Sequence, residues 1–313
     1  MLEPRGHADM TGAVLTEPVM PGSHAGLLFL DNDGYAPMSG TGVIAATAIA
    51  LARGLIVPGG DGATVVYDTP AGTVTATASN APAAIPSVVG EASASGAGAP
   101  REGHRSRVTF TNVPSFVLHA GVAVKIGARE IRADVAFGGA FYAIVDSEAT
   151  GIPLDAAHMP DLRRTGMEIA RGVERAHDIV HPIEPALSGL RGTIFTGPPT
   201  GGEGPAQAGP HVEHAALRNV TVFADAAVNR SPGGTGTSAV MAVVDAMGLL
   251  GPGAPFVHES VLGTRLTGRV AGRARVGEYD AVVTEIEGSA WITGEHTFVI
   301  DDDDPLKDGF RMA

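Results

Sequence analysis

Residues 38–55, MSGTGVIAATAIALARGL, are matched later in the chain by residues 232–249, PGGTGTSAVMAVVDAMGL. Aligned at Ser39 and Gly233, the two copies lie 194 residues apart and share the skeleton G-T-G-x-x-A-x-x-A-x-x-x-A-x-G-L. Each copy follows an extended segment and then becomes rich in alanine, which indicates a Gly-rich turn that opens a helix. The repeat therefore predicts two lobes built on one plan.

The rest of the chain favours strands over helices. Besides the repeats, whose helices are expected at about 43–53 and 237–247, residues 161–179 have a helical pattern, with Pro160 placed at a helix start. Short β-branched runs bounded by Gly, Pro, Asn or Asp indicate strands. These runs are 12–18, 25–31, 63–69, 107–113, 141–146, 193–197, 219–225, 279–286 and 296–300. Many strands with few helices predict an α+β protein with two β-rich lobes.

Composition limits the possible functions. At roughly 150 residues per domain, the 313 residues predict about two domains. The chain contains no cysteine, which excludes disulfides, thiolate metal sites, iron–sulfur clusters and thiol nucleophiles. A formal net charge of −13, with no cluster of Lys or Arg, argues against a surface that binds nucleic acid.

The sequence predicts a cytoplasmic protein without a membrane partner. The first ten residues, MLEPRGHADM, lack the apolar core of a secretory signal. The apolar run 43–57 is interrupted by Arg53 and is shorter than the roughly 20 residues that span a bilayer. Residues 79–104 and 197–209, rich in small residues and proline, are expected to be inserted loops without a role in chemistry.

The two Gly-Thr-Gly loops are candidate anion sites. A helix N-terminus leaves backbone N–H groups unpaired and carries partial positive charge, and glycine lets a ligand come close to the backbone. One such loop alone is more often only a tight turn before a packed helix. Its duplication at matching positions favours two facing loops that hold one small carboxylate between them.

A nicotinamide site is the competing interpretation of the first loop. Residues 40–45 fit the G-x-G-x-x-A pattern of dinucleotide-binding folds. The acidic residue expected at the end of the next strand is replaced by the Pro-Gly-Gly of residues 58–60, and the chain lacks alternating strand–helix units. The sequence therefore disfavours this alternative.

Three polar clusters contain residue types that can bind a metal. His177 and His181, with Glu174 one turn earlier, superficially suit a metal, but histidines near a helix C-terminus commonly complement the helix dipole. The pair His211 and His214 has no stronger pattern. Residues 301–304 are four consecutive aspartates without the spacing of a calcium loop, so they predict a solvated turn. No metal is expected.

Ordered motifs along nearly the whole chain resemble those of the proline racemase family, which includes hydroxyproline epimerases and trans-3-hydroxy-L-proline dehydratases. These motifs are RGHADM at 5–10, the loop 38–42, DVAFGGAFY at 134–142, TGPP at 196–199, NRSP at 229–232 with its Gly-Thr-Gly, GTR at 263–265, ITG at 292–294 and DPL at 304–306. The resemblance implies two pseudo-symmetric lobes of the diaminopimelate-epimerase type, each with a central helix, a site in the cleft between the lobes, and no cofactor.

The resemblance also implies lobe boundaries. We expect an N-terminal lobe of residues 1–117 plus about 290–313, and a C-terminal lobe of residues 118–289. Because the chain opens at RGHADM, the N-terminal lobe is expected to lack the first strands that other members possess. Whether two copies of the chain form a homodimer is left open.

Four residues depart from the family pattern. Racemases of the family carry one cysteine in each loop, on opposite faces of the substrate Cα, where this chain has Ser39 and Gly233. A histidine is usual where this chain has Thr41, and an aspartate where it has Asn229; both help the family to hold the substrate amine. Position 233 is therefore a vacant second acid/base position.

These departures favour elimination over racemisation. Racemisation needs a proton acceptor and a donor on opposite faces of Cα, whereas β-elimination of water needs one base. The first choice is a trans-3-hydroxy-L-proline dehydratase with Ser39 as base; the plainer role of Ser39 is a helix N-cap. Asn229 would face the ring nitrogen. The residues expected to hold the carboxylate are Gly40, Thr41, Gly42, Gly234, Thr235 and Gly236.

Two alternatives stay open. Within the enzymes, the runner-up is a 4-hydroxyproline 2-epimerase or a proline racemase. In another class, the chain is a degenerate, non-catalytic member that binds a small carboxylate, since Thr41 and Asn229 lack the charges that would hold an ammonium group.

Overall fold

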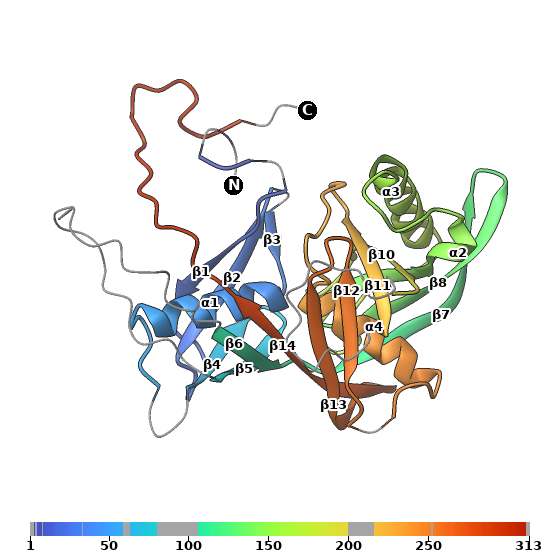
Figure 1. The fold of residues 1–313 in the computed structure, drawn as a ribbon, viewed down its shortest axis with the longest axis horizontal. Helices are drawn as coiled ribbons and strands as arrows, with labels where there is room; N and C mark the ends of the chain where they lie inside the picture. The colour runs from blue at the N-terminus through green and yellow to red at the C-terminus, as the bar shows by residue number, and fades with distance from the viewer. Residues whose placement is uncertain are drawn as a thin grey trace.

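The computed structural model describes residues 3, 5–7, 9–32, 34–58, 63–79, 106–199, 216–251 and 253–310. Figure 1 shows two lobes side by side, each containing one helix of the repeat. The expected insertions 79–104 and 197–209 lie almost entirely outside the described residues, and so do His211 and His214.

The first lobe consists of α1 (Gly40–Ala52) and a set of short strands. The strands are β1 (Gly12–Thr16), β2 (Ala25–Asp31), β3 (Gly34–Ala36), β4 (Thr64–Thr69), β5 (Gly72–Ser79) and β6 (Ser106–Thr111). Helix α1 is rich in Ala, Val and Ile on every side, as expected of a helix enclosed by other elements, and it packs against β1, β5 and β6.

The second lobe consists of α4 (Gly234–Ala246), the outer helices α2 (Ser147–Thr150) and α3 (Met159–Ala176), and longer strands. The strands are β7 (Ser115–Ile126), β8 (Arg129–Phe137), β9 (Phe141–Asp146), β10 (Leu190–Gly197), β11 (Leu217–Phe223), β12 (Phe256–Ser260) and β13 (Arg265–Val276). Every residue of α4 from Gly234 to Val243 is buried. The amphipathic α3 covers β7, β10 and β11 from outside.

Strand β14 (Tyr279–Ala290) joins the two lobes into one sheet. The strand order is β1-β2-β4-β5-β6-β14-β13-β12-β11-β10-β9-β8-β7, and β7 pairs back onto β14. Residues 285–290 of β14 pair with β6, whereas Ala281 and Val282 pair with β7. The pairing of β7 with β14 closes a ring of strands around α4, and α1 also packs on β14.

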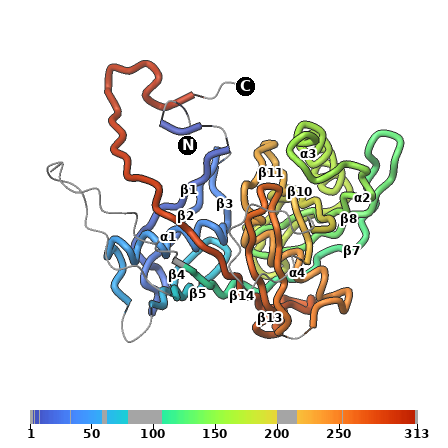
Figure 2. The backbone as a smooth tube through the Cα atoms, in the orientation of Figure 1, coloured from blue at the N-terminus to red at the C-terminus, as the bar shows by residue number. Residues whose placement is uncertain are grey.

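The C-terminal segment returns to the first lobe. In Figure 2 the tube beyond β14 passes the first lobe, arches above it and ends near the N-terminus. A bridge between Glu3 and Phe310 and an ion pair between Arg53 and Glu295 hold it there. The lobe boundaries expected from the resemblance stay a prediction.

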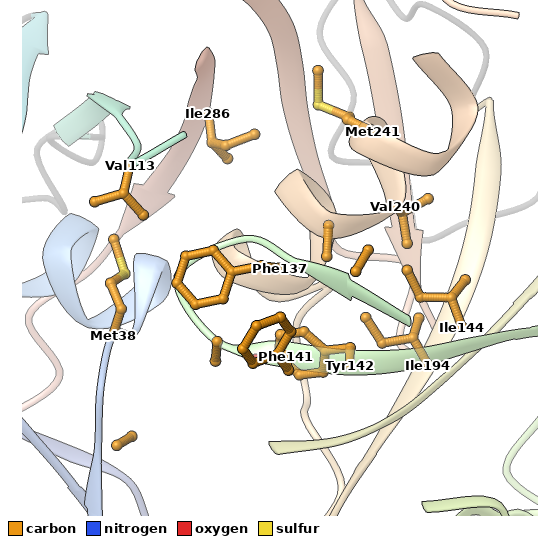
Figure 3. Close-up of a cluster of buried hydrophobic side chains, with 14 of the residues drawn as sticks. Met38, Val113, Phe137, Phe141, Tyr142, Ile144, Ile194, Val240, Met241 and Ile286 are labelled. Atoms are coloured by element: carbon orange, nitrogen blue, oxygen red, sulfur yellow. The ribbon is translucent and has the colours of Figure 1, made fainter. Parts of the chain in front are cut away.

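The hydrophobic core is continuous across the two lobes. Figure 3 shows the rings of Phe137, Phe141 and Tyr142 between Met38, just before α1, and the α4 side chains Val240 and Met241. The rings of Phe137 and Phe141 lie 4.9 Å apart. This packing fixes the start of each repeat helix against the other.

The helices are confirmed, with shifted ends. α1 and α4 begin at Gly40 and Gly234, three residues before the predicted starts, because Gly-Thr-Gly forms the first helical turn instead of preceding it. α3 ends at Ala176, since His177 is already extended at φ −142° and ψ 142°.

The strand expected at 296–300 is wrong. Residues 291–300 form no strand, and Phe298, Val299 and Ile300 are exposed. A β-branched run becomes a strand when a neighbouring strand offers hydrogen bonds and apolar contacts, and this run crosses the surface without one. The turn expected in the four aspartates is present at Asp302 and Asp303.

Candidate functional site

The N-termini of α1 and α4 meet at two glycines. A Cβ atom built on Gly234 would lie 2.6 Å from the Cα of Gly40, and one built on Gly40 would lie 2.6 Å from the Cα of Gly234 and 2.5 Å from the Phe110 ring. No residue with a side chain permits this approach. The glycines of the repeat therefore bring the two loops into contact.

A cavity opens beside this contact, between the lobes. Most residues that the sequence predicted for the site line it: Ser39, Gly40, Thr41, Asn229, Gly233, Gly234 and Thr235. Gly42 and Gly236 do not line it; a Cβ on Gly42 would meet the Phe29 ring at 2.8 Å, and one on Gly236 would meet Ile194 at 3.0 Å. Those two glycines serve packing in the first helical turn.

Ser39 is both a helix cap and a cavity residue. Its backbone is extended, at φ −139° and ψ 107°, and its Oγ accepts a hydrogen bond of 3.2 Å from the Gly42 N–H. The Oγ also lies 3.3 Å from the Thr41 Oγ1, with which it shares a hydrogen bond. An N–H donor and the positive end of α1 both stabilise negative charge on this oxygen.

Gly233 occupies the matching position in the second loop, in a different backbone conformation. Its φ is +79°, a region that favours glycine, and no side chain caps α4. A Cβ atom at this position would lie 2.9 Å from the Asn229 Nδ2. The second loop thus contributes N–H groups but no acid or base at position 233.

Asn229 is engaged by its own loop. Its Oδ1 accepts hydrogen bonds from the Ser231 N–H at 3.2 Å and the Ser231 Oγ at 3.3 Å, and that Oγ accepts the Gly233 N–H at 3.2 Å. Buried Asn219 donates from Nδ2 to the Pro232 carbonyl at 2.8 Å. The Asn229 group left to face the cavity is its Nδ2, which is a donor.

Sequence reasoning missed a buried tyrosine at the site. The Tyr142 hydroxyl lies 2.8 Å from the Thr235 Oγ1, and both residues line the cavity. Complete burial raises the pKa of Tyr142 to about 12, so the phenol stays protonated. Tyr142 is the last residue of the DVAFGGAFY motif at 134–142, and this motif could have identified it as a site residue.

An ion pair that joins the two lobes at the cavity was also not predicted from the sequence. Arg191, on β10 of the second lobe, pairs with Asp31, at the end of β2 in the first lobe, 160 residues earlier. The guanidinium lies 4.7 Å from the centre of the Phe223 ring. Burial lowers the pKa of Arg191, and the neighbouring Asp225 carboxylate opposes that shift. Asp9, Asp31, Arg191, Asp225 and Arg230 all line the cavity.

His177 and His181 pack against other rings. The His177 ring lies 4.7 Å from that of His119, and the His181 ring lies 4.8 Å from that of Phe137. Glu174 accepts the Leu190 N–H at 2.9 Å. Within the described residues, no group of three or more His, Cys, Asp or Glu side chains is arranged to hold a metal ion. None of the described helices is both long and apolar enough to cross a membrane.

The chain matches known proteins over its whole length. It is 37% identical over 313 residues to a trans-3-hydroxy-L-proline dehydratase of Bacillus cereus, and 36% identical over 314 residues to a proline racemase of Clostridioides difficile. Each match covers 100% of this chain and 84% of the relative.

The fold has a close solved counterpart. A hydroxyproline epimerase from Agrobacterium vitis, solved with bound trans-4-hydroxy-L-proline, superposes with a TM-score of 0.82 at 30% identity, covering 100% of this chain and 81% of that one. A sequence model of the family described as proline racemase matches residues 1–311. With this match, the two lobes and the shared cavity agree with the motifs: the chain belongs to the proline racemase family.

Proposed function

We propose that this protein is a lyase that removes water from trans-3-hydroxy-L-proline, with Ser39 as the base. The observation that carries the proposal is the asymmetry of the two loops. Ser39 has a side chain that can exchange a proton, whereas Gly233 has none and occupies a backbone conformation that favours glycine. One base suffices for elimination, and racemisation needs two groups on opposite faces. The Bacillus cereus relative bears the name of this activity.

The helix ends would bind and activate the substrate. The first N–H groups of an α-helix have no partner within the helix, so the turns that begin at Gly40 and Gly234 offer donors from two sides. A carboxylate held between them gains negative charge as the Cα–H bond breaks. Preorganised N–H dipoles stabilise that enolate-like charge more than the ground state, which lowers the barrier.

The proposed reaction balances without another reactant. Ser39 Oγ, in its deprotonated form, takes the Cα proton, the electrons of that bond form a C2=C3 double bond, and the C3–O bond breaks. The departing hydroxide needs one proton, which balances the one taken by Ser39. Water leaves, and the ring enamine becomes a cyclic imine. The Gly42 N–H and the helix end lower the cost of charge on Ser39 Oγ.

Turnover in deuterated water tests the proposal. Purified protein is incubated separately with trans-3-hydroxy-L-proline, trans-4-hydroxy-L-proline and L-proline, and the products are followed by NMR and mass spectrometry. We expect loss of water from the 3-hydroxy compound alone. Recovered substrate with inverted configuration and deuterium at Cα would instead identify an epimerase or racemase. Binding without either reaction would identify the non-catalytic alternative.

A further inference from the structure

An amino-acid substrate leaves one charge unmatched in this cavity. The helix ends accept the carboxylate, but the ring ammonium needs acceptors. Asn229 cannot provide one, because its Oδ1 already accepts from Ser231 and its Nδ2 is a donor. Thr41 is neutral and shares its hydroxyl hydrogen bond with Ser39. The ammonium partner must therefore come from elsewhere in the lining.

Among the described residues, the anions that line the cavity are Asp9, Asp31 and Asp225. Asp9 pairs with Arg163 of α3 at 3.4 Å. Asp31 and Asp225 both interact with Arg191, so this group carries two negative charges and one positive charge. The other lining cation, Arg230, is exposed.

We propose that Asp31 and Asp225, which line the cavity with Arg191, are specificity-determining residues that bind the ammonium group of the ligand. This inference rests on the proposed function, because it assumes a carboxylate between the helix ends. The group has a net charge of −1, which supplies the anion that position 229 lacks. Asp31 belongs to the first lobe and Asp225 to the second, so an ammonium ion at this group contacts both lobes.

The local structure keeps this charge in place. Asp31 Oδ1 accepts the Gly34 N–H at 3.1 Å, and Asp225 Oδ1 accepts the Ala227 N–H at 3.0 Å. The exposed fraction of the Arg191 side chain is 16% and that of Asp31 is 10%. Limited solvent strengthens the attraction between this group and a cation, compared with a pair in water.

Two ligands of the same ring size separate the ammonium from the carboxylate. L-Proline carries both, whereas tetrahydrofuran-2-carboxylate has an ether oxygen in place of the ammonium. Isothermal titration calorimetry gives a dissociation constant for each, and their ratio is the preference for the ammonium. We expect the unaltered protein to prefer L-proline by about tenfold or more, as a charge-assisted hydrogen bond predicts.

The preference should follow the charge of the group. Asp31→Asn and Asp225→Asn each bring the net charge to zero and should lower the ratio by about tenfold, while Arg191→Gln leaves two negative charges and should raise it. Glu285→Gln is the matched control: it also removes a carboxylate paired with an arginine, Arg269, but it lies outside the cavity lining and should leave the ratio unchanged.

The outcomes separate this inference from the proposed function. Equal binding of the two ligands by the unaltered protein would overturn the inference and leave the carboxylate site intact; this needs no variant to fold. An equal weakening of both ligands in Asp31→Asn and Asp225→Asn would also overturn it. Such a pattern would mean that these residues hold the lobes together and do not recognise the ammonium group. Failure of the unaltered protein to bind either ligand at millimolar concentration would overturn the inference alone if the protein still removes water from trans-3-hydroxy-L-proline. Without that turnover, it would overturn the proposed function and the inference together.

Discussion

The two copies of the repeat start their helices in different ways. In the first loop, Ser39 caps α1 with its side chain from an extended backbone. In the second, Gly233 precedes α4 at φ +79°, and the side chains of Asn229 and Ser231 support the loop instead. The comparison teaches that the asymmetry lies in backbone conformation as well as residue type. The first loop presents a hydroxyl group at this position, and the second presents only backbone.

The contact between Gly40 and Gly234 is what the two loops share, and breaking it should have the largest effect. Gly40→Ala or Gly234→Ala would put a methyl group within 2.6 Å of the facing backbone. We expect a loss of about 3 kcal/mol in unfolding free energy, the upper range for overpacking, together with loss of ligand binding. Urea denaturation measures the first and calorimetry the second.

The control for that test is Gly251→Ala. Its Cβ would make ordinary contact at 3.7 Å, with the Ala254 side chain. An unfolding free energy for Gly40→Ala or Gly234→Ala as high as that of Gly251→Ala would contradict the close approach.

Lowering the pH should weaken the packing around α4 more than the packing around α1. Buried His258 lies 3.0 Å from the Thr237 hydroxyl of α4, whereas the matching residue of α1, Val43, has no titratable partner. Burial lowers the pKa of His258 from 6.5 to about 3. The unfolded chain binds a proton below pH 6.5 and the folded chain does not, so stability is present above pH 6.5 and is lost progressively towards pH 3. Between pH 6.5 and 4.5 we expect a loss of about 2 to 3 kcal/mol from this residue.

Urea denaturation across that pH range, compared with His258→Gln, isolates the contribution. The variant removes the titration, so its stability should fall less between pH 6.5 and 4.5. Parallel pH profiles for the two proteins would show that His258 does not control the acid response.

Adding a side chain to the second loop should be costly. Gly233→Ser makes the two loops alike in sequence, but a left-handed backbone and the 2.9 Å approach of a Cβ to Asn229 Nδ2 oppose it. The expected loss is about 1 to 3 kcal/mol, the usual cost of such backbone strain. A melting temperature equal to that of the unaltered protein would mean that the loop relaxes readily. Gly233→Cys should share this strain, so installing cysteines at both loops would require a folded protein to be demonstrated first.

The reverse exchange should have the smallest effect on stability. Ser39→Gly gives the first loop the residue of the second, and glycine at an N-cap costs only a few tenths of a kcal/mol relative to serine. If Ser39 is the base, turnover of trans-3-hydroxy-L-proline should be lost while the melting temperature changes little. Retained turnover in this variant would remove Ser39 from the proposed mechanism.

Removal of a helix N-cap outside the cavity is the control for Ser39→Gly. Asp146 caps the short outer helix α2 by accepting the Glu148 N–H at 2.9 Å. Asp146→Ala should lower stability without abolishing turnover, because α2 does not line the cavity.

Local patterns predicted the repeat helices, because a helix depends on residues close in sequence. The facing of the two loops, 194 residues apart, was predicted from the duplication of Gly-Thr-Gly and not from a local pattern. Local patterns did not predict the Arg191–Asp31 pair, since opposite charges 160 residues apart carry no signal of contact. The positive φ at Gly233 was not predictable either, because a glycine can adopt either sign of φ and one residue does not decide between them. The apolar run 296–300 misled because strand propensity says nothing about an available neighbour.

The meeting of α1 and α4 places two like poles head to head. Each helix start carries about half a positive elementary charge, so the poles repel while nothing lies between them. A small anion placed there would turn repulsion into attraction on both sides and so draw the lobes together. The unfolding free energy should therefore rise by RT ln(1 + [L]/Kd) with the concentration of a carboxylate, even one that cannot react, and the melting temperature should rise with it. A bound carboxylate would then act as part of the interior, and a thermal-shift screen of simple acids would reveal which shape stabilises the protein most.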